Sequence, residues 1–375
     1  QSALGARFAR QRTLEVKAAS QAWPGSCMSS ETADEVLTRH GVKDLANKVI
    51  IITGANGNIA QEVGTALAQR NASLILACRS PAKCEATRAH IQSQRKVSNA
   101  SLEIEQLDLS DRSNIAAFAK RITDKHPKIA VLINSAGTFA NGVSKDGLST
   151  LMEANLLGPA LLTHLLLPAL RGGNGRAPGR VVNVAAATYG VELAANETAA
   201  DLAALCKPDN PKTDFGISKF LLTHHALELA QREPEIAAFA LNPGVALPEG
   251  NLPIWVKKLI KHVGYMDWIF RVLPAGLKRF VKACSTNEKG LESCPQSLPQ
   301  SASVTVAAAA WPGIESYSGS YLDFKTESLP FDAPQVYGPF VQSDPTCVPR
   351  DAPPMHESLR SAWYDEMLVL MGVAP

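Results

Sequence analysis

From residue 48 onward, short apolar runs rich in β-branched residues alternate with longer stretches in which apolar residues recur at helical spacing. The runs predict buried strands at 49–53, 74–77, 102–107, 129–133, 181–184 and 236–241. The stretches between them predict helices at 59–69, 81–95, 111–125, 147–170 and 215–232. Strand and helix repeated in this order predict an α/β fold, a single domain built on a doubly wound parallel sheet.

The first 28 residues differ in composition from the rest. Four basic residues face one acidic residue among Ala, Ser and Gln: Arg7, Arg10, Arg12 and Lys17 against Glu15. This composition resembles an organellar transit segment, and a flexible basic tail explains it equally well. Ser30 is a candidate N-cap for a helix at 31–40 that Gly41 would close. We expect residues 1–42 to form an N-terminal extension.

The alternation of strands and helices ends at residues 250–285. Apolar residues recur there at helical spacing among many lysines and arginines, and Asp267 is the one acidic residue. Such a basic amphipathic segment is typical of docking on an anionic membrane surface or a protein partner, and we expect this contact at 254–282. A lid packed over a substrate cleft is the open alternative.

The remaining pattern completes the expected organisation. Pro-, Ser- and Gln-rich stretches at 286–302 and 329–354 predict loops, and a last helix is expected at 357–371. We therefore expect a main domain at 43–328, which includes the basic amphipathic segment, followed by a Pro-rich loop and helix at 329–375.

Composition and charge narrow the classes of function. Lys and Arg total 37 against 35 Asp and Glu, so no net charge favours nucleic acid. No apolar run reaches 18 residues, so no transmembrane segment is expected. The 7 cysteines are scattered without metal-ligand spacing, which favours a reducing compartment over a disulfide scaffold or a metal site. We expect an organelle interior, plastid ahead of mitochondrion, at a membrane periphery.

A glycine-rich turn follows the first predicted strand and opens the next helix. Its residues are candidates for binding a dinucleotide, because backbone N–H groups at a helix N-terminus bind phosphate: Gly54, Asn56, Gly57, Asn58 and Ile59. Here the chain resembles the short-chain dehydrogenase/reductase (SDR) family, closest to its retinol-dehydrogenase-like members. The family pattern at this turn is TGxxxGxG.

The resemblance continues in register over about residues 43–372. It rests on Ala77-Cys78-Arg79, Leu107-Asp108-Leu109, Asn134-Ser135-Ala136-Gly137, Asn155, Phe215-x-x-x-Lys219 and Asn242-Pro243-Gly244. It implies a Rossmann-like fold that binds a nicotinamide dinucleotide. The further cofactor positions that it implies are Asp108, Leu109, Asn134, Ala136, Gly137, Lys219, Pro243 and Gly244.

Three residues that differ from the family pattern affect the expected binding of the cofactor. Asn58 and Ala60 replace the second and third glycines of the pattern, and we expect the Asn58 side chain to obstruct the phosphate and weaken binding. A turn kept only as an element of the fold is the open alternative. Arg79 stands where a carboxylate would bind the ribose 2′-hydroxyl, and a guanidinium pairs with a 2′-phosphate, so NADP(H) is favoured over NAD(H).

The family transfers hydride between alcohols and carbonyls with Ser, Tyr, Lys and Asn. Asn155 and Lys219 match this set, whereas Phe215 stands in place of the tyrosine and Ala186 in place of the serine. A tyrosine hydroxyl moves the proton and a serine hydroxyl polarises the carbonyl. The two groups that touch the reacting oxygen are therefore absent.

Neighbouring residues are candidates for a displaced proton donor. Thr188 and Tyr189 follow Ala186 closely and carry hydroxyl groups. We expect Ser218 to face another side of its helix. His224 and His225 are expected to be packing or surface residues.

These observations lead to three hypotheses. We expect a non-catalytic protein of the SDR fold that acts as a structural or assembly subunit of a larger complex. This hypothesis is compatible with NADP(H) binding by the subunit but does not require it. Its partners would be proteins, at a membrane surface through 254–282, and not nucleic acid. The alternative is an active NADP-dependent oxidoreductase with a displaced proton donor, such as Tyr189, or with a substrate that needs none, such as an activated double bond that takes its proton from water. A regulator whose partner interface responds to NADP(H) is a third hypothesis.

Overall fold

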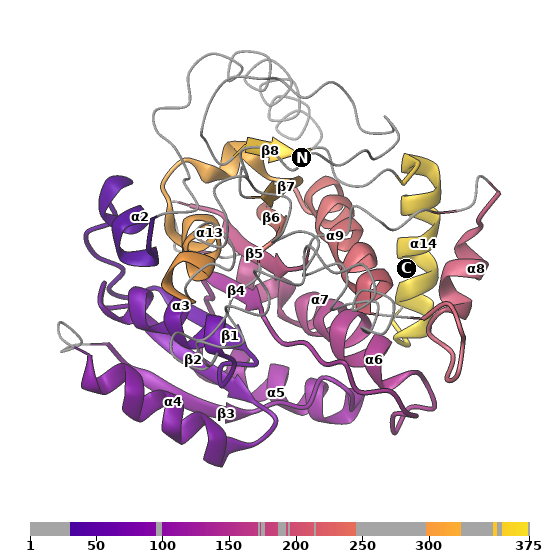
Figure 1. Ribbon diagram of the computed structural model, residues 1–375, viewed down its shortest axis with the longest axis horizontal. Helices are drawn as coiled ribbons and strands as arrows, with labels where there is room; N and C mark the ends of the chain where they lie inside the picture. Colours follow the sequence, from indigo (N-terminus) through magenta and orange to yellow (C-terminus); the bar gives the residue numbers. More distant parts are fainter. Residues whose placement is uncertain are drawn as a thin grey trace, which may run out of the picture.

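A computed structural model describes residues 31–94, 100–171, 173, 177–186, 193, 196–213, 215–244, 298–323, 348–350 and 355–373. Within these ranges one sheet has the strand order β3-β2-β1-β4-β5-β6-β7-β8 (Figure 1). The strands are β1 (Val49–Thr53), β2 (Ser73–Cys78), β3 (Leu102–Gln106), β4 (Val131–Asn134), β5 (Gly179–Val184), β6 (Ile236–Leu241), β7 (Ser320–Asp323) and β8 (Val348–Arg350). β1 to β7 are parallel, and β8 pairs antiparallel with β7.

Helices cover both faces of the sheet (Figure 1). The α-helices are α2 (Ala33–Arg39), α3 (Asn58–Ala68), α4 (Pro81–Ser93), α5 (Arg112–Lys125), α6 (Thr150–Met152), α7 (Gly158–Arg171), α8 (Ala199–Ala204), α9 (Phe215–Arg232), α13 (Leu298–Ala310) and α14 (Glu357–Leu370). A π-helical turn, η1 (Glu153–Leu157), joins α6 to α7, and a 3-10 turn, η3 (Ile314–Tyr317), follows α13. The prediction of a doubly wound α/β fold is confirmed.

Alternate residues of each strand enter two separate cores. Ile50 and Ile52 of β1 belong to the core that contains α2, α3, α4 and α13. Ile51 belongs to the core on the other face, with α5, α7, α9 and α14. A parallel strand that is buried on both faces has an unbroken run of apolar residues. For this reason these strands could be predicted from the sequence.

The predicted cap of the first helix was wrong by two residues. Thr32, not Ser30, is the N-cap of α2, and the Glu35 side chain completes a capping box. The Thr32 N–H donates to Glu35 Oε2 at 2.8 Å, so each residue satisfies the other's backbone N–H. Gly41 ends the helix with φ +69°, as predicted.

Two other predicted boundaries are corrected. Residues 286–302 were expected to be a loop, but α13 begins at Leu298 and packs its alanine-rich sequence against α2 and α3. The helix expected at 147–170 begins at Thr150 and continues to Arg171, with the π-helical turn η1 between α6 and α7. Asn155 lies in this π-helical turn, and such turns occur often at functional sites. The segment at 250–285 lies outside the described residues.

Among the described residues, the helical segment 150–171 is long and apolar enough to cross a membrane. Of its most apolar window, 78% is buried within the fold. It lies in the core beneath the sheet, with Leu162, Leu166 and Leu170 fully buried. Its composition is explained by this packing.

Candidate active site

A cavity of about 300 Å³ opens at the carboxyl ends of the strands in the first half of the sheet. It lies where the chain order reverses, with β2 and β3 on one side of β1 and β4 on the other. Open α/β sheets bind ligands at this reversal. Its lining residues are Gly54, Asn56, Gly57, Arg79, Ser80, Lys83, Leu107, Asp108, Leu109, Ser110, Ser135, Ala136, Gly137, Thr138, Thr150 and Ala154.

Gly54 brings the loop after β1 against the loop after β4. Its φ is +62°, and a Cβ placed there would lie 2.7 Å from Ala136 Cα, so no larger residue fits. Thr53 Oγ1 accepts hydrogen bonds from the N–H groups of Ser135 at 3.1 Å and Ala136 at 3.2 Å. These contacts fix the narrow inner wall of the cavity.

The N-terminus of α3 faces this wall. Gly57 is its N-cap and supplies no side-chain hydrogen bond, so the first N–H groups of the helix are left for a ligand. Asn58 is exposed and, like the half-buried Ile59, does not line the cavity. Ala60 is 3% exposed and packs in the core, where a methyl group is accommodated. The expected obstruction by Asn58 stays a prediction.

Three side chains from the β2–α4 turn line the outer part of the cavity. They are Arg79, Ser80 and Lys83. Arg79 and Lys83 are exposed, and neither forms an ion pair with any described residue. Sequence reasoning found Arg79 but missed Lys83, although its position four residues later, across the start of a helix, was an available signal.

The loop after β3 forms the opposite wall. Asp108 Oδ1 accepts hydrogen bonds from Ser110 N at 3.0 Å and Ser110 Oγ at 2.6 Å, which holds the predicted residues Asp108 and Leu109 in a tight turn. Gly158 at the start of α7 contacts this turn, and a Cβ on it would overlap the Leu109 carbonyl oxygen. The sequence analysis did not identify this role of Gly158.

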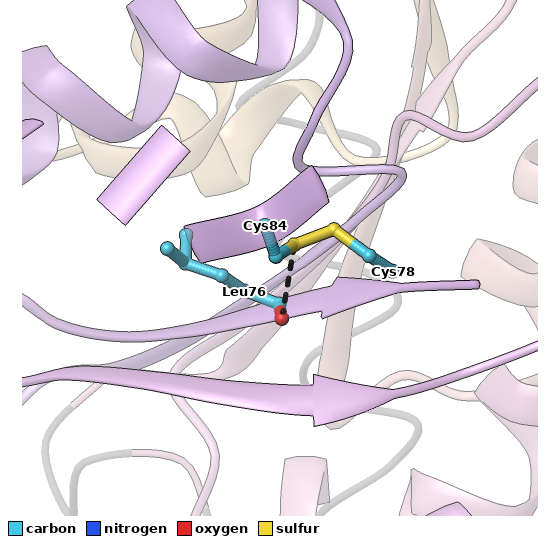
Figure 2. The surroundings of a disulfide bond; sticks show 3 residues. All are labelled: Leu76, Cys78 and Cys84. Atoms are coloured by element: carbon cyan, nitrogen blue, oxygen red, sulfur yellow. Dashed lines mark hydrogen bonds between the residues drawn. A yellow bond between two sulfur atoms is a disulfide. The ribbon is translucent and has the colours of Figure 1, made fainter. Parts of the chain in front are cut away.

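A disulfide links Cys78, the last residue of β2, to Cys84 in the first turns of α4 (Figure 2). The Cα atoms are 6.2 Å apart, and both residues are buried. The expectation of a cysteine set without disulfides is corrected here. The linear spacing gave no signal, because the pair forms only when α4 folds back onto β2.

Asn155 is fully buried and joins three elements. Its Oδ1 accepts the Thr138 N–H at 2.7 Å, and its Nδ2 donates to Thr138 O at 3.0 Å and Ser218 Oγ at 3.1 Å. Ser218 Oγ in turn donates to Phe215 O at 2.8 Å. Asn155 therefore locks the loop after β4 to the start of α9.

Lys219 lies beside Asn155 with its ammonium group out of contact with water. Its Nζ donates to Val184 O at 2.9 Å and Ala136 O at 3.4 Å, and a Cβ on Gly137 would lie 3.5 Å from it. Burial lowers the pKa of Lys219 to about 8. The structure thus brings together Asn155, Gly137 and Lys219, as the sequence predicted, but Lys219 does not line the described cavity.

An aromatic ring occupies the position at which the family places a hydroxyl. The Phe215 ring centroid lies 5.7 Å from Lys219 Nζ and 4.2 Å from that of Phe139, and the two rings are stacked. Phe139 is 76% exposed. The Ala186 methyl offers no hydrogen bond, and its carbonyl accepts one from the Tyr321 hydroxyl at 2.8 Å.

The polar side chains of α9 that were considered as replacement proton donors interact with other residues of the fold. Ser218 is buried, and its hydroxyl group forms hydrogen bonds with Asn155 and the Phe215 carbonyl. It was expected to face another side of the helix, but it contacts the site residue Asn155. His225 Nδ1 contacts Asn183 Nδ2 at 3.1 Å, and burial lowers the pKa of His225 to about 4. His224 packs edge-on against Phe220. Thr188 and Tyr189 lie outside the described residues.

Besides Asn58, Ile59 and Lys219, three more predicted cofactor residues do not line the described cavity. Asn134 is buried behind the loop and donates to Asn183 Oδ1 at 2.9 Å and Thr163 Oγ1 at 3.2 Å. Pro243 and Gly244 follow β6, where Gly244 has φ +73° and its N–H donates to Asn242 Oδ1 at 3.0 Å. Their part in cofactor binding stays a prediction.

Comparison with known proteins gives the family. The family profile described as short chain dehydrogenase matches residues 48–198. The chain is 32% identical over 248 residues to retinol dehydrogenase 12 of Bos taurus, a match that covers 65% of this chain and 72% of that protein. The chain belongs to the short-chain dehydrogenase family. It is a retinol-dehydrogenase-like member of it.

Other matches agree with this family. Retinol dehydrogenase 12 of Mus musculus is 35% identical over 209 residues, which are 55% of this chain and 63% of that protein. A 7α-hydroxysteroid dehydrogenase solved with NADH and 7-oxo glycochenodeoxycholic acid has a TM-score of 0.52 at 16% identity, over 76% of this chain and 95% of that chain. At that identity the structural match establishes the fold alone.

Proposed function

We propose that this short-chain dehydrogenase binds NADP(H) in the described cavity and acts as an oxidoreductase whose proton does not pass through residue 215. The observation that carries the proposal is the buried Lys219 ammonium beside Asn155. An ammonium buried among backbone carbonyls lowers the stability of the fold. Such a group is expected to be retained where it contributes to binding or chemistry.

The residues present fit a dinucleotide. Gly54 lies so close to Ala136 that a Cβ at residue 54 would fill the space between the two loops, and we call this space the cradle. The N-terminus of α3, whose N-cap Gly57 provides no side-chain hydrogen bond, attracts phosphate. Arg79 and Lys83 suit a 2′-phosphate, because both are cationic and have no ion-pair partner among the described residues. Asp108 and Leu109 would lie along the adenosine.

When bound, NADP(H) supplies or accepts hydride. Lys219 would hold the ribose at the nicotinamide end, since its Nζ lies at the junction of the loops after β4 and β5. Asn155 fixes the loop that carries Thr138, a residue that lines the cavity. Phe215 and Phe139 present stacked apolar faces near Lys219.

The absent hydroxyl groups define the substrate class. A simple ketone needs a proton at its oxygen as hydride arrives, and neither Phe215 nor Ala186 can supply one. An α,β-unsaturated carbonyl accepts hydride at its β-carbon and a proton from water at its α-carbon. This class of substrate fits the apolar site.

We expect Arg79→Ala to weaken NADPH binding by about tenfold or more and to leave NADH binding within about twofold, because one charge-assisted hydrogen bond to the 2′-phosphate is lost. Calorimetric titration with both nucleotides measures the effect. Arg88→Ala is the matched control, since Arg88 lies on α4, the helix that follows the turn with Arg79, pairs with Glu85 at 2.6 Å and does not line the cavity. Equal losses for NADPH and NADH would contradict the assignment of Arg79.

Restoring the hydroxyl groups tests the proton route. We expect the native chain to oxidise NADPH in the presence of an α,β-unsaturated carbonyl. The double substitution Phe215→Tyr with Ala186→Ser should raise the rate on saturated aldehydes by roughly 10²-fold, the lower end for general acid catalysis. The same double substitution in a Lys219→Met background is the control, because the tyrosine pKa is then not lowered. Absence of turnover by the native chain on every substrate tested would exclude the oxidoreductase proposal.

One observation favours a second function, nucleotide binding without turnover. The stacked Phe139 and Phe215 rings occupy the place of the reacting hydroxyl, and 76% of Phe139 is exposed to solvent. An exposed aromatic side chain is also a feature of protein contacts. A subunit of a larger assembly would bind NADPH, show no turnover, and purify with its partners in a pull-down.

A further inference from the structure

The Cys78–Cys84 disulfide encloses the side chains that line the outer part of the cavity. The segment between the two cysteines holds Arg79, Ser80 and Lys83. Cys78 ends β2, and Cys84 lies in the first turns of α4 (Figure 2). The bond therefore closes a loop whose polar side chains face the cavity.

Few other interactions fix this loop. Within it, the Ser80 carbonyl accepts the N–H groups of Lys83 at 3.1 Å and Cys84 at 3.4 Å, and Ser80 gives the helix no side-chain cap. The buried residues of α4 are Cys84, Thr87 and Ile91. One of the three buried residues of this helix is thus the cysteine of the disulfide itself.

The strand end, by contrast, is firmly held. Cys78 pairs with Gln106 across β2 and β3, and its carbonyl accepts the Leu107 N–H at 2.9 Å. The disulfide ties the start of α4 to this fixed point. The position of Arg79 and Lys83 over the cavity depends on that tie.

We propose that the Cys78–Cys84 disulfide positions the 2′-phosphate-binding side chains, so that its reduction weakens the binding of NADPH and not of NADH. This inference rests on the proposed function, because it concerns the nucleotide assigned to the same cavity. The pyrophosphate and the nicotinamide end are met by other loops, after β1, β4 and β5. Only the 2′-phosphate, which NADH lacks, depends on the turn between Cys78 and Cys84.

The reductant is a dithiol. Two electrons and two protons pass from the dithiol to the Sγ–Sγ bond, which breaks to give two thiols, and the dithiol becomes a cyclic disulfide. Cys84 Sγ lies 3.6 Å from the Leu76 carbonyl oxygen, so the Cys84 thiol has a hydrogen-bond acceptor on β2 (Figure 2). Cys78 is then free of α4, and the turn loses its covalent closure.

Both sulfur atoms are buried, so reduction requires the turn to open. Nucleotide bound to Arg79 and Lys83 opposes that opening. By thermodynamic reciprocity, a tenfold weaker affinity of the reduced protein for NADPH means that NADPH makes the disulfide tenfold harder to reduce. That factor corresponds to about 30 mV.

The test is titration of the oxidised and the dithiothreitol-reduced full chain with NADPH and with NADH. We expect reduction to raise the dissociation constant for NADPH about tenfold, equivalent to roughly 1.4 kcal/mol, and to change that for NADH by less than about twofold. Cys84→Ser should behave as the reduced protein in both states. Cys206→Ser is the matched control, because Cys206 is a buried free cysteine outside the cavity.

The possible results of this titration distinguish failure of the inference from failure of the proposed function. An equal change for both nucleotides, no change for either, or alkylation of Cys78 and Cys84 in the oxidised protein would overturn the inference and leave NADP(H) binding intact. Failure of both nucleotides to bind in either redox state would instead overturn the proposed function and the inference with it. If Cys84→Ser does not fold, the comparison of oxidised with reduced native chain decides, with circular dichroism to confirm that both are folded.

Discussion

Replacing Gly54 with alanine is expected to lower the free energy of unfolding by about 2–5 kcal/mol. The left-handed backbone at φ +62° costs an alanine roughly 1–2 kcal/mol. The added Cβ would also lie 2.7 Å from Ala136 Cα, and relieving that overlap moves the loop after β4 at a cost of about 1–3 kcal/mol. Urea denaturation followed by circular dichroism measures the loss. NADPH affinity should fall with it, because the cradle widens.

Gly41→Ala separates the two causes. Gly41 has φ +69°, but no atom lies within 4 Å of a Cβ placed on it, so the substitution carries only the backbone cost of about 1–2 kcal/mol. The difference between the two variants measures the contact between the loops after β1 and β4. If Gly41→Ala and Gly54→Ala are equally destabilised, the close contact with Ala136 is not a constraint on the site.

Replacing Lys219 with methionine is expected to make the stability of the protein less dependent on pH. The pKa of Lys219 is about 8 in the folded state against 10.5 for an unperturbed lysine. Below pH 8 the side chain is charged in both states, and its burial costs about 3 kcal/mol, at 1.36 kcal/mol for each unit of pKa. Between pH 8 and 10.5 the folded state loses its proton first, so this cost fades and stability rises with pH.

Methionine carries no charge at any pH, so the variant lacks that rise. The stability of Lys219→Met relative to the native chain should fall by about 3 kcal/mol between pH 7 and pH 10.5. Its absolute stability at pH 7 also reflects the loss of hydrogen bonds to the Val184 and Ala136 carbonyls. The difference across pH is therefore the deciding quantity.

Lys128→Met is the matched control, because Lys128 is exposed and its charge is solvated in both states. Urea denaturation at several pH values from 7 to 10.5 should give the same dependence for Lys128→Met as for the native chain. A Lys219→Met variant with the native pH dependence would show that Lys219 stays protonated in the fold, and would remove the argument that its burial is costly.

The sequence located most of the sheet and the long helices. The predicted bounds of β1, β6 and α9 agree with the structure, because strands buried on both faces and a long helix packed on them leave unbroken apolar signals. α13 was missed because its first residues, Leu298 to Ser301, have a loop-like composition, and it is helical because it packs against α2 and α3. β7 has no run of apolar residues and is a strand because it pairs with β6 and β8.

The lining of the cavity was predictable in part. Gly54, Asn56, Gly57, Arg79 and Asp108 could be placed together because they lie in short segments that follow strand ends. Ser80 and Lys83 also line the cavity and were missed, although the spacing of Lys83 from Arg79 was an available signal.

The sequence by itself determined the α/β fold, the membership of a dehydrogenase family, and the absence of hydroxyl groups at residues 186 and 215. These properties depend on residue identity and on local periodicity. The tertiary structure alone decided the burial of Lys219, its lowered pKa, and the pairing of Cys78 with Cys84. Electrostatic shifts and covalent closure depend on distances between elements, and those distances are set by packing rather than by the order of residues along the chain.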